Sequence, residues 1–447
     1  MPHRILRGER KMKKVYLSLI SALLLCAIAI SFFGCNSMEA TDLMEGITPN
    51  ETPQKPSPKP PTASGDPTDK PPVSDEPAAL KAADNAAATD FALRLFRASN
   101  EKGKNTLISP LSVLCALSMT ANGAKGETRE QMEATLGMPI EELNLYISNY
   151  MNSLPNTEKY KLHLANSIWF TDDERFTVNE DFLQINDDYY GADAYKAPFD
   201  DSTLEDINNW VKKETDGMIP KVLDEIPPEA VMYLVNALAF EAEWSDIYEK
   251  KQVRDGTFTK EDGTKQSVEF MYSDESTYLE DDKAIGFKKY YKDRKYAFVA
   301  LLPNEGVSVD EYIASLDGES LNALLSNAKN TSVSAKMPKF ETEYDVEMSK
   351  VLQSMGMIDA FDGNKADFSG LGTSSAGNLR INRVIHKTFI SVAEKGTKAG
   401  ASTVVEVTDE SAPMEVKRVF LDRPFVYMLI DCENNIPFFI GTMMDVN

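Results

Sequence analysis

The spacing of apolar and polar residues divides positions 78–447 into helical and extended segments. Apolar residues recur three and four positions apart, the helical period, in segments 78–99, 109–118, 127–136, 141–153, 179–190 and 203–216. Apolar runs or two-residue alternation, typical of strands, occupy 162–170, 231–240, 337–346, 388–393, 425–431 and 437–443. Because both kinds of segment mix without a fixed repeat, the pattern predicts one α+β domain.

Two of these segments have identifiable positions in such a domain. Segment 231–240 is almost wholly apolar, which suits a central strand covered on both faces. Asn236 lies inside this run and must then find hydrogen-bond partners. Ser109 followed by Pro110 is a common helix start, because serine caps the first free amides and proline fits the first helical position.

A further extended segment, 397–408, has no evident partner strand. One face carries Thr397, Ala399, Ala401, Thr403, Val405 and Val407, and the other carries Lys398, Gly400, Ser402, Glu406 and Thr408. An edge hairpin or a loop would explain this composition in an isolated stretch. The extended stretch continues through residues 409–413 without a turn signal before them. The small residues 399–402 also offer few side-chain atoms for packing. We therefore predict a strand-competent segment that is held outside a sheet.

This segment and its surroundings resemble the serpins, protease inhibitors whose reactive loop inserts into a sheet. Residues 394–403, EKGTKAGAST, resemble the reactive-loop hinge, and 419–425, VFLDRPF, resemble the strand after the loop. Further family motifs follow in the right order: SPLS (109–112), GAKGET (123–128), VNALAF (235–240) before Trp244, MPKF (337–340), ADFSG (366–370) and VIHK (384–387). The resemblance covers about 364 residues, from Asp84 to the end.

The resemblance implies a fold and a set of sites. The expected fold is α+β, with large mixed and antiparallel sheets, about nine helices and an exposed reactive-centre loop. The hinge would comprise Glu394, Gly396, Thr397, Ala399, Gly400, Ala401, Ser402 and Thr403. The shutter, a polar cluster over which sheet strands part, would comprise Ser109, Ser112, Asn236 and His386. The breach, where insertion begins, would lie at Trp244. The chain departs from the family at 241–243, EAE, where a lysine and a glycine are common.

The implied function is inhibition of serine-type endopeptidases by a suicide-substrate mechanism. A protease would cut the loop and become acylated. The freed loop segment would then enter the central sheet as a new strand, and the acylated protease would be trapped. Family spacing places the cut at Glu410–Ser411, whereas counting back from 423–425 permits Ser411–Ala412. Glu410 suggests a glutamyl-specific protease; cleavage one residue away, or at Val405 or Val407, would suit elastase-like or subtilisin-like enzymes. These extracellular serine proteases are the expected partners of a monomeric inhibitor.

Two other functional classes were weighed. A non-inhibitory surface serpin, acting as a protease substrate or a binding lipoprotein, would be favoured by bulky or charged inward hinge residues, which are absent. An enzyme is not expected, because beyond the N-terminal leader only His163 and His386 are present and no hydrolase, metalloprotease or nucleotide-binding motif occurs. We predict no cofactor and no metal. Cys115 and Cys432 lie in apolar runs and are expected to be buried free thiols.

The first 77 residues predict export and anchoring. Three lysines precede the apolar run 15–33, which ends at Gly34-Cys35, so residues 1–35 read as a signal peptide with a lipid-attachment cysteine, Cys35. A single membrane span is the alternative. Residues 36–77 hold ten prolines from Pro49 onward and predict a disordered linker, followed by a serpin domain at 78–447. Residues 1–34 carry six Lys/Arg and one Glu, a net charge of +5. Because the whole chain has a net charge of −23, the residues after 34 carry −28 and would repel nucleic acid. The protein is therefore expected at the cell surface as a membrane-anchored lipoprotein.

Overall fold

The computed structural model describes residues 40–44, 47, 82–154, 160–228, 230–375, 377–397 and 416–446. These contain nine α-helices: α2 (Ala82–Ser99), α3 (Pro110–Ala121), α4 (Gly126–Leu136), α5 (Ile140–Ser153), α6 (Glu180–Tyr190), α7 (Asp201–Glu214), α8 (Val309–Ser315), α9 (Gly318–Ser326) and α10 (Ser349–Ser354). In these ranges no helix is long and apolar enough to cross a membrane.

Most strands belong to two large sheets. The seven-stranded sheet has the order β1 (Thr41–Asp42), β5 (Asp193–Ala197), β3 (Tyr160–Thr171), β6 (Met232–Glu243), β15 (Gly396–Thr397), β14 (Ile385–Ala393) and β12 (Phe340–Glu347). The nine-stranded sheet has the order β16 (Lys417–Phe420), β11 (Lys329–Pro338), β8 (Lys265–Glu280), β9 (Ala284–Tyr290), β10 (Tyr296–Pro303), β17 (Phe425–Asp431), β18 (Ile436–Met443) and β2 (Thr106–Ile108), with β7 (Val253–Thr259) paired to β8. A small pair joins β4 (Phe176–Val178) and β13 (Gly372–Ser374).

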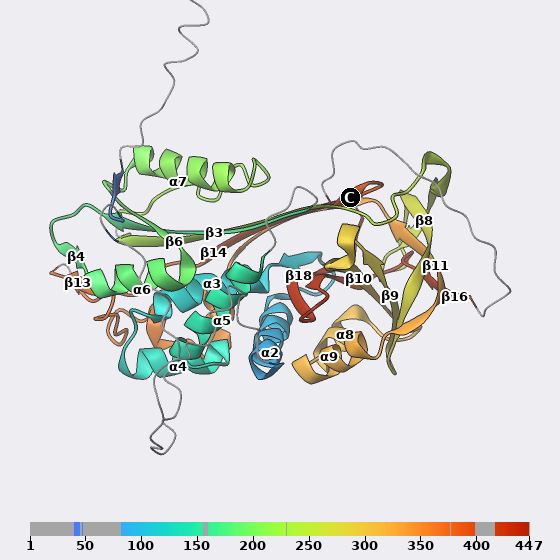
Figure 1. Ribbon diagram of the computed structural model, residues 1–447, viewed down its shortest axis with the longest axis horizontal. Coiled ribbons are helices and arrows are strands. Elements are labelled where there is room, and N and C mark those ends of the chain that lie inside the picture. Colours follow the sequence, from blue (N-terminus) through green and yellow to red (C-terminus); the bar gives the residue numbers. More distant parts are fainter. Residues whose placement is uncertain are drawn as a thin grey trace, which may run out of the picture.

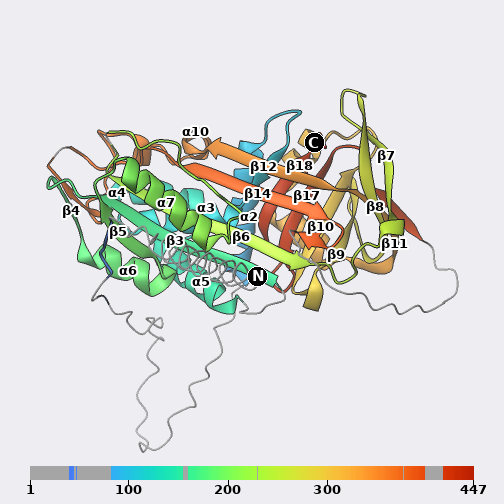
Figure 2. The same cartoon turned by 90° about the horizontal axis from the view of Figure 1, so that it is seen from above.

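The seven-stranded sheet lies between helices on both faces. Helix α7 covers one face, while α3, α5 and α6 lie beneath the other (Figure 1). Seen from above, α7 lies over β3 and β6 and runs in nearly the same direction (Figure 2). The predicted α+β fold with about nine helices is confirmed.

Helix α3 is buried because its sequence is apolar or small all round. Eleven of its twelve residues are buried. Ser109 caps the helix by accepting a hydrogen bond from the Ser112 amide, and Pro110 occupies the first turn, as the sequence predicts. A helix without a charged face needs cover on every side, which places α3 directly below the sheet.

Two predicted segments require correction. Segment 337–346 was expected to be one strand, but the chain changes sheets between Pro338 and Phe340, so β11 and β12 belong to different sheets. The alternation cannot reveal this, because the residues on both sides fit a strand. Cys115 is buried as expected, whereas Cys432 is only half-buried.

The predicted linker 36–77 is also wrong in part. Thr41–Asp42 forms strand β1 against the edge strand β5, and the Leu43 amide donates to the Ala194 carbonyl over 2.8 Å. The side chains of Leu43, Met44 and Ile47 pack on the main core. These three apolar residues precede most of the proline-rich sequence, and their burial offsets the entropy of ordering the chain there.

Candidate functional site

The hinge begins inside the seven-stranded sheet. Gly396 and Thr397 form β15, which pairs antiparallel with both β14 and β6; Thr397 lies between Val392 and Ala242. A side chain at position 396 would collide with the Ala242 carbonyl oxygen, so only glycine fits there. The expectation that segment 397–408 is held outside a sheet is therefore wrong for its first residue, Thr397. Residue 398 and the rest of the hinge lie outside the described residues.

Thr397 occupies a buried position at the breach, which is called the hinge seat below. Its side chain is 2% exposed, and its hydroxyl is hydrogen-bonded to the Tyr291 hydroxyl. Tyr291 stacks on Trp244 with ring centroids 4.4 Å apart. Trp244 in turn donates its indole N–H to the Ala393 carbonyl over 2.8 Å. The aromatic pair thus fixes the point where the hinge enters the sheet.

Charged groups hold the chain just before this seat. The Lys339 Nζ lies 2.9 Å from a Glu394 carboxylate oxygen and 3.1 Å from one of Glu269. The hydrogen bond to Glu394 raises the pKa of Lys339. Below Trp244, a buried ion pair joins Lys289 and Glu275 over 2.9 Å, with Lys289 1% exposed. These contacts link the hinge to β12 and to the nine-stranded sheet.

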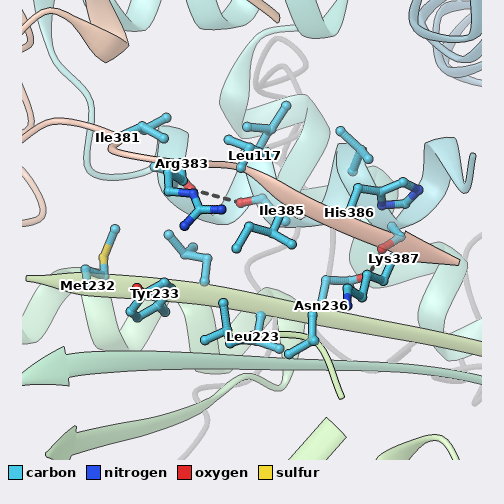
Figure 3. A pocket seen from close by; sticks show the side chains of 18 of the residues that line it. Leu117, Leu223, Met232, Tyr233, Asn236, Ile381, Arg383, Ile385, His386 and Lys387 are labelled. Atoms are coloured by element: carbon cyan, nitrogen blue, oxygen red, sulfur yellow. Dashed lines mark hydrogen bonds between the residues drawn. The ribbon is translucent and has the colours of Figure 1, made fainter. Parts of the chain in front are cut away.

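Beyond β15 the two strands on either side of the hinge separate. Among the described residues, β15 is the only strand that pairs with both β6 and β14. Between the lower parts of these strands lies a cavity of about 90 Å³, bounded by residues 232–236 of β6, residues 380–387 on the β14 side, and α3. Figure 3 shows Met232 and Ile381 at one end of this space and Asn236, His386 and Lys387 at the other. Within the described part of the chain, the sheet therefore lacks strand pairing between β6 and β14 at this place.

The four predicted shutter residues lie together below this gap. The Ser109 amide donates to His386 Nε2 over 3.0 Å, and the Ser112 hydroxyl donates to the Asn236 side-chain oxygen. The Asn236 side-chain amide extends this series of hydrogen bonds by donating to Asn166 Oδ1 over 2.6 Å. One polar network thus connects α3 with β14, β6 and β3.

Burial determines the protonation of this network. His386 is 5% exposed, and desolvation lowers its pKa to about 4. The imidazole is therefore neutral at pH 7 and can accept the Ser109 N–H at Nε2. Burial raises the pKa of the Cys115 thiol, which lies 3.2 Å from Asn166 Oδ1. This thiol contributes a hydrogen bond to the network and is not a nucleophile.

The structure brings the described predicted residues into two groups. Glu394, Gly396, Thr397 and Trp244 meet at the breach, and Ser109, Ser112, Asn236 and His386 meet at the shutter. Outside the described residues lie Ala399, Gly400, Ala401, Ser402, Thr403, Glu410, Ser411, Ala412 and Cys35.

Sequence reasoning missed three members of these groups. Asn166 carried a usable signal, since an amide inside the apolar strand segment 162–170 needs a buried partner just as Asn236 does. Lys339 stands inside the MPKF motif, but the motif alone does not pair it with Glu394. Tyr291 carried no signal, because it reaches the hinge only through the tertiary fold.

A comparison with known proteins identifies the family of this chain. Residues 86–446 match the family model of the serpins, the serine protease inhibitors. The chain is a serpin. An uncharacterised serpin-like protein of Thermococcus kodakarensis is 30% identical over 370 residues, covering 80% of this chain and 85% of the relative. Human serpin B8 is 29% identical over 365 residues, covering 78% and 96%.

Solved structures agree with this assignment. The thermophilic serpin tengpin in its native state is 50% identical and superposes with a TM-score of 0.81, covering 91% of this chain and all of that one. Tengpin in its latent state gives a TM-score of 0.75 and covers 83% of this chain. The family is generally one of protease inhibitors and not of catalytic enzymes.

Proposed function

We propose that this serpin inhibits extracellular serine proteases as a suicide substrate. The observation that carries the proposal is β15: the hinge already occupies the first two positions of a strand between β6 and β14, with a cavity beyond it. A segment cut from its C-terminal attachment could continue this strand in the same direction. Every hydrogen bond that it formed with β6 and β14 would stabilise the inserted state.

The register of β15 predicts where each later residue would be placed. Thr397 is opposite Ala242 and Val392, so continued antiparallel pairing would place Thr403 opposite Asn236 and His386. Residues 405 and 407 would then lie opposite Leu234 and Met232, beside the cavity. Thr397 faces the core, so the alternation predicts that small or β-branched residues follow it inward at every second position.

The chemical step belongs to the protease. Its serine Oγ would attack the carbonyl carbon of Glu410, the C–N bond to Ser411 would break, and the Ser411 amine would leave with a proton. The acyl-enzyme joins the protease to the end of the inserting strand. Insertion of about 15 residues would carry the protease about 50 Å and deform the oxyanion hole needed for deacylation. A glutamyl endopeptidase fits Glu410, whereas elastase-like and subtilisin-like enzymes fit the neighbouring bonds, Ser411–Ala412 included.

We also propose a surface location for this monomeric inhibitor. The apolar run before Cys35 would direct export, and the Cys35 sulfur would form a thioether with a diacylglyceryl group as that group leaves its phospholipid headgroup phosphate, which takes up the thiol proton. A membrane span over residues 15–33 would attach the chain at nearly the same point.

Incubation with a glutamyl endopeptidase, an elastase and a subtilisin tests the inhibitory mechanism. A denaturation-resistant band of summed mass, together with release of a peptide that starts at Ser411, is expected for at least one protease. Glu410→Ala should abolish trapping of the glutamyl enzyme, with Ser411→Ala as the matched control that keeps it. Cleaved serpin without any covalent complex, from every protease, would instead support the non-inhibitory alternative.

A further inference from the structure

The N-terminal segment fixes where a membrane anchor can lie. β1 adds a strand to the β5 edge of the seven-stranded sheet. Leu43, Met44 and Ile47 pack on the main core, and Ala40 packs on a smaller apolar cluster that contains Trp169 and Trp210. The chain returns to the body at α2, which starts at Ala82. Residues 48–81 therefore join two segments that both pack on the same body, and they add nothing to the reach of an anchor at Cys35.

We propose that the edge of the sheet at β1 faces the lipid surface and that the hinge end points away from it. This inference rests on the proposed anchor at or just before Cys35. Cys35 lies six residues before Thr41, and six extended residues span at most about 20 Å. Without β1, residues 36–81 would form the tether, with a root-mean-square length of about 35–40 Å and an extended length of about 150 Å. Docking of β1 thus shortens the tether several-fold.

The strand register places β1 and the hinge at opposite ends of the sheet. Thr41 is opposite Lys196 of β5, which is opposite Phe170 of β3, which is opposite Met232 of β6. Thr397 instead lies opposite Ala242. Ten residues of β6 separate the two levels, or about 33 Å. Figure 1 shows β1 at one end of the long axis and β16, which follows the loop, at the other.

Charge favours an upright orientation over one in which the body lies flat. The chain after residue 34 carries a net charge of −28, so an anionic lipid surface repels it. The smallest contact compatible with the short tether is the end that carries β1. The reactive loop is then presented to proteases in the surrounding medium.

This orientation has a consequence for the trapped complex. Insertion in the β15 register would bring residue 407 to the level of Met232, which is the level of β1. The acylated protease would arrive at the membrane-facing end. A protease of about 230 residues has a radius of gyration of about 17 Å, so it does not fit within the 20 Å tether. On a membrane, trapping would require β1 to leave β5 and release the longer tether; in solution it would not.

The three tryptophans of the chain allow a direct test. Trp169 lies against Tyr195 of β5 with ring centroids 4.4 Å apart, and Trp210 donates to Asp193 of β5, whereas Trp244 lies at the breach. The full chain would be reconstituted in liposomes that contain a dansyl-labelled phosphatidylethanolamine. Energy transfer to the headgroup acceptor is expected to be several-fold greater for Trp244→Phe, which keeps the two tryptophans that contact β5, than for Trp169→Phe/Trp210→Phe, which keeps Trp244.

A variant that undocks β1 makes the test decisive. Leu43→Pro/Ile47→Asp removes the amide donor to Ala194 and two apolar contacts; in the Trp244→Phe background it should lose most of the transfer. Leu43→Met keeps the amide and should retain it. Equal transfer from both ends of the sheet, or no change on undocking, would overturn the inference.

A second measurement uses the chain without tryptophan substitutions. A photoactivatable phospholipid should cross-link to peptides that contain residues 193–197 and not to those that contain 416–420. Failure of the full chain to bind liposomes would refute the anchor itself. No readout here involves a protease, so the outcome is separate from the inhibitory mechanism, and trapping in solution can fail without affecting it.

Discussion

The two large sheets differ in how completely their strands are paired. In the nine-stranded sheet, β10, β17 and β18 pair along their whole length, with one register shift after Leu429, and every one of their residues is buried. In the seven-stranded sheet, as far as its residues are described, β6 and β14 are joined through only two residues of β15, and a cavity follows. One sheet is complete, and the other has room for a strand. Stability and the capacity to rearrange are therefore located in different parts of the molecule.

The side chains beneath the two sheets follow the same division. Phe298 of β10 is fully buried and stacks on Tyr427 with centroids 5.8 Å apart. At the incomplete sheet, Ser109 and Ser112 at the start of α3 form a polar network with Asn236 of β6 and His386 of β14. A polar network can exchange hydrogen-bond partners when strands part, whereas an interlocked aromatic core loses its contacts outright.

The largest expected effect is a loss of packing in the complete sheet. Phe298→Ala should lower the free energy of unfolding by about 3–5 kcal/mol. Ile385→Ala, beside the cavity and only half-buried, should cost less than about 2 kcal/mol. Denaturant midpoints measure both. Equal losses would show that the two sheets are packed alike.

The shutter should make stability depend on pH. The folded-state pKa of His386, about 4, lies below its unfolded value of about 6.5. The stabilisation is complete above pH 6.5 and is lost as the pH falls toward 4, by a total of about 3 kcal/mol. His386→Gln keeps an acceptor for the Ser109 amide and should remove this dependence. An unchanged pH profile in that variant would assign the effect to other groups.

A charge in the hinge seat should block strand completion. Thr397→Arg would place a guanidinium between Ala242 and Val392, where the native side chain is 2% exposed, and should reduce the trapped fraction of protease at least about tenfold. Thr397→Val retains the volume and loses only the hydrogen bond to Tyr291. It should trap protease nearly as well. Gel densitometry of the covalent complex measures both variants.

The smallest expected effect concerns the ion pair between Lys339 and Glu394 at the start of the hinge. Burial raises the pKa of Glu394, but the hydrogen bond and the charge of Lys339, together with a backbone hydrogen bond, outweigh this and lower it. Both side chains are about one-third exposed. Glu394→Gln should therefore cost less than about 1 kcal/mol, and the difference from the unsubstituted chain should shrink at high salt. A loss that is independent of salt would point to packing.

Much of the fold follows from local pattern. The start of α3 at Ser109-Pro110, the central strand around Asn236 and the C-terminal hairpin of β17 and β18 were all predictable, because each has its own signal within a few residues. The break between β11 and β12 was not, because both sides fit a strand and only the tertiary fold sends them to different sheets. The strand at Thr41–Asp42 was hidden by the prolines that follow it.

The sequence by itself determined the serpin fold and predicted which residues form the shutter and the hinge, since these depend on residue types in a fixed order. Only the tertiary structure decided that Thr397 is already seated between β6 and β14, that Asn166 and Tyr291 complete the two groups, and that β1 docks on β5. The contacts of Asn166 with Asn236, of Tyr291 with Thr397 and of β1 with β5 each join residues more than 60 positions apart. Such pairs form only when the whole chain is packed, because their energy depends on burial and register that no local segment possesses.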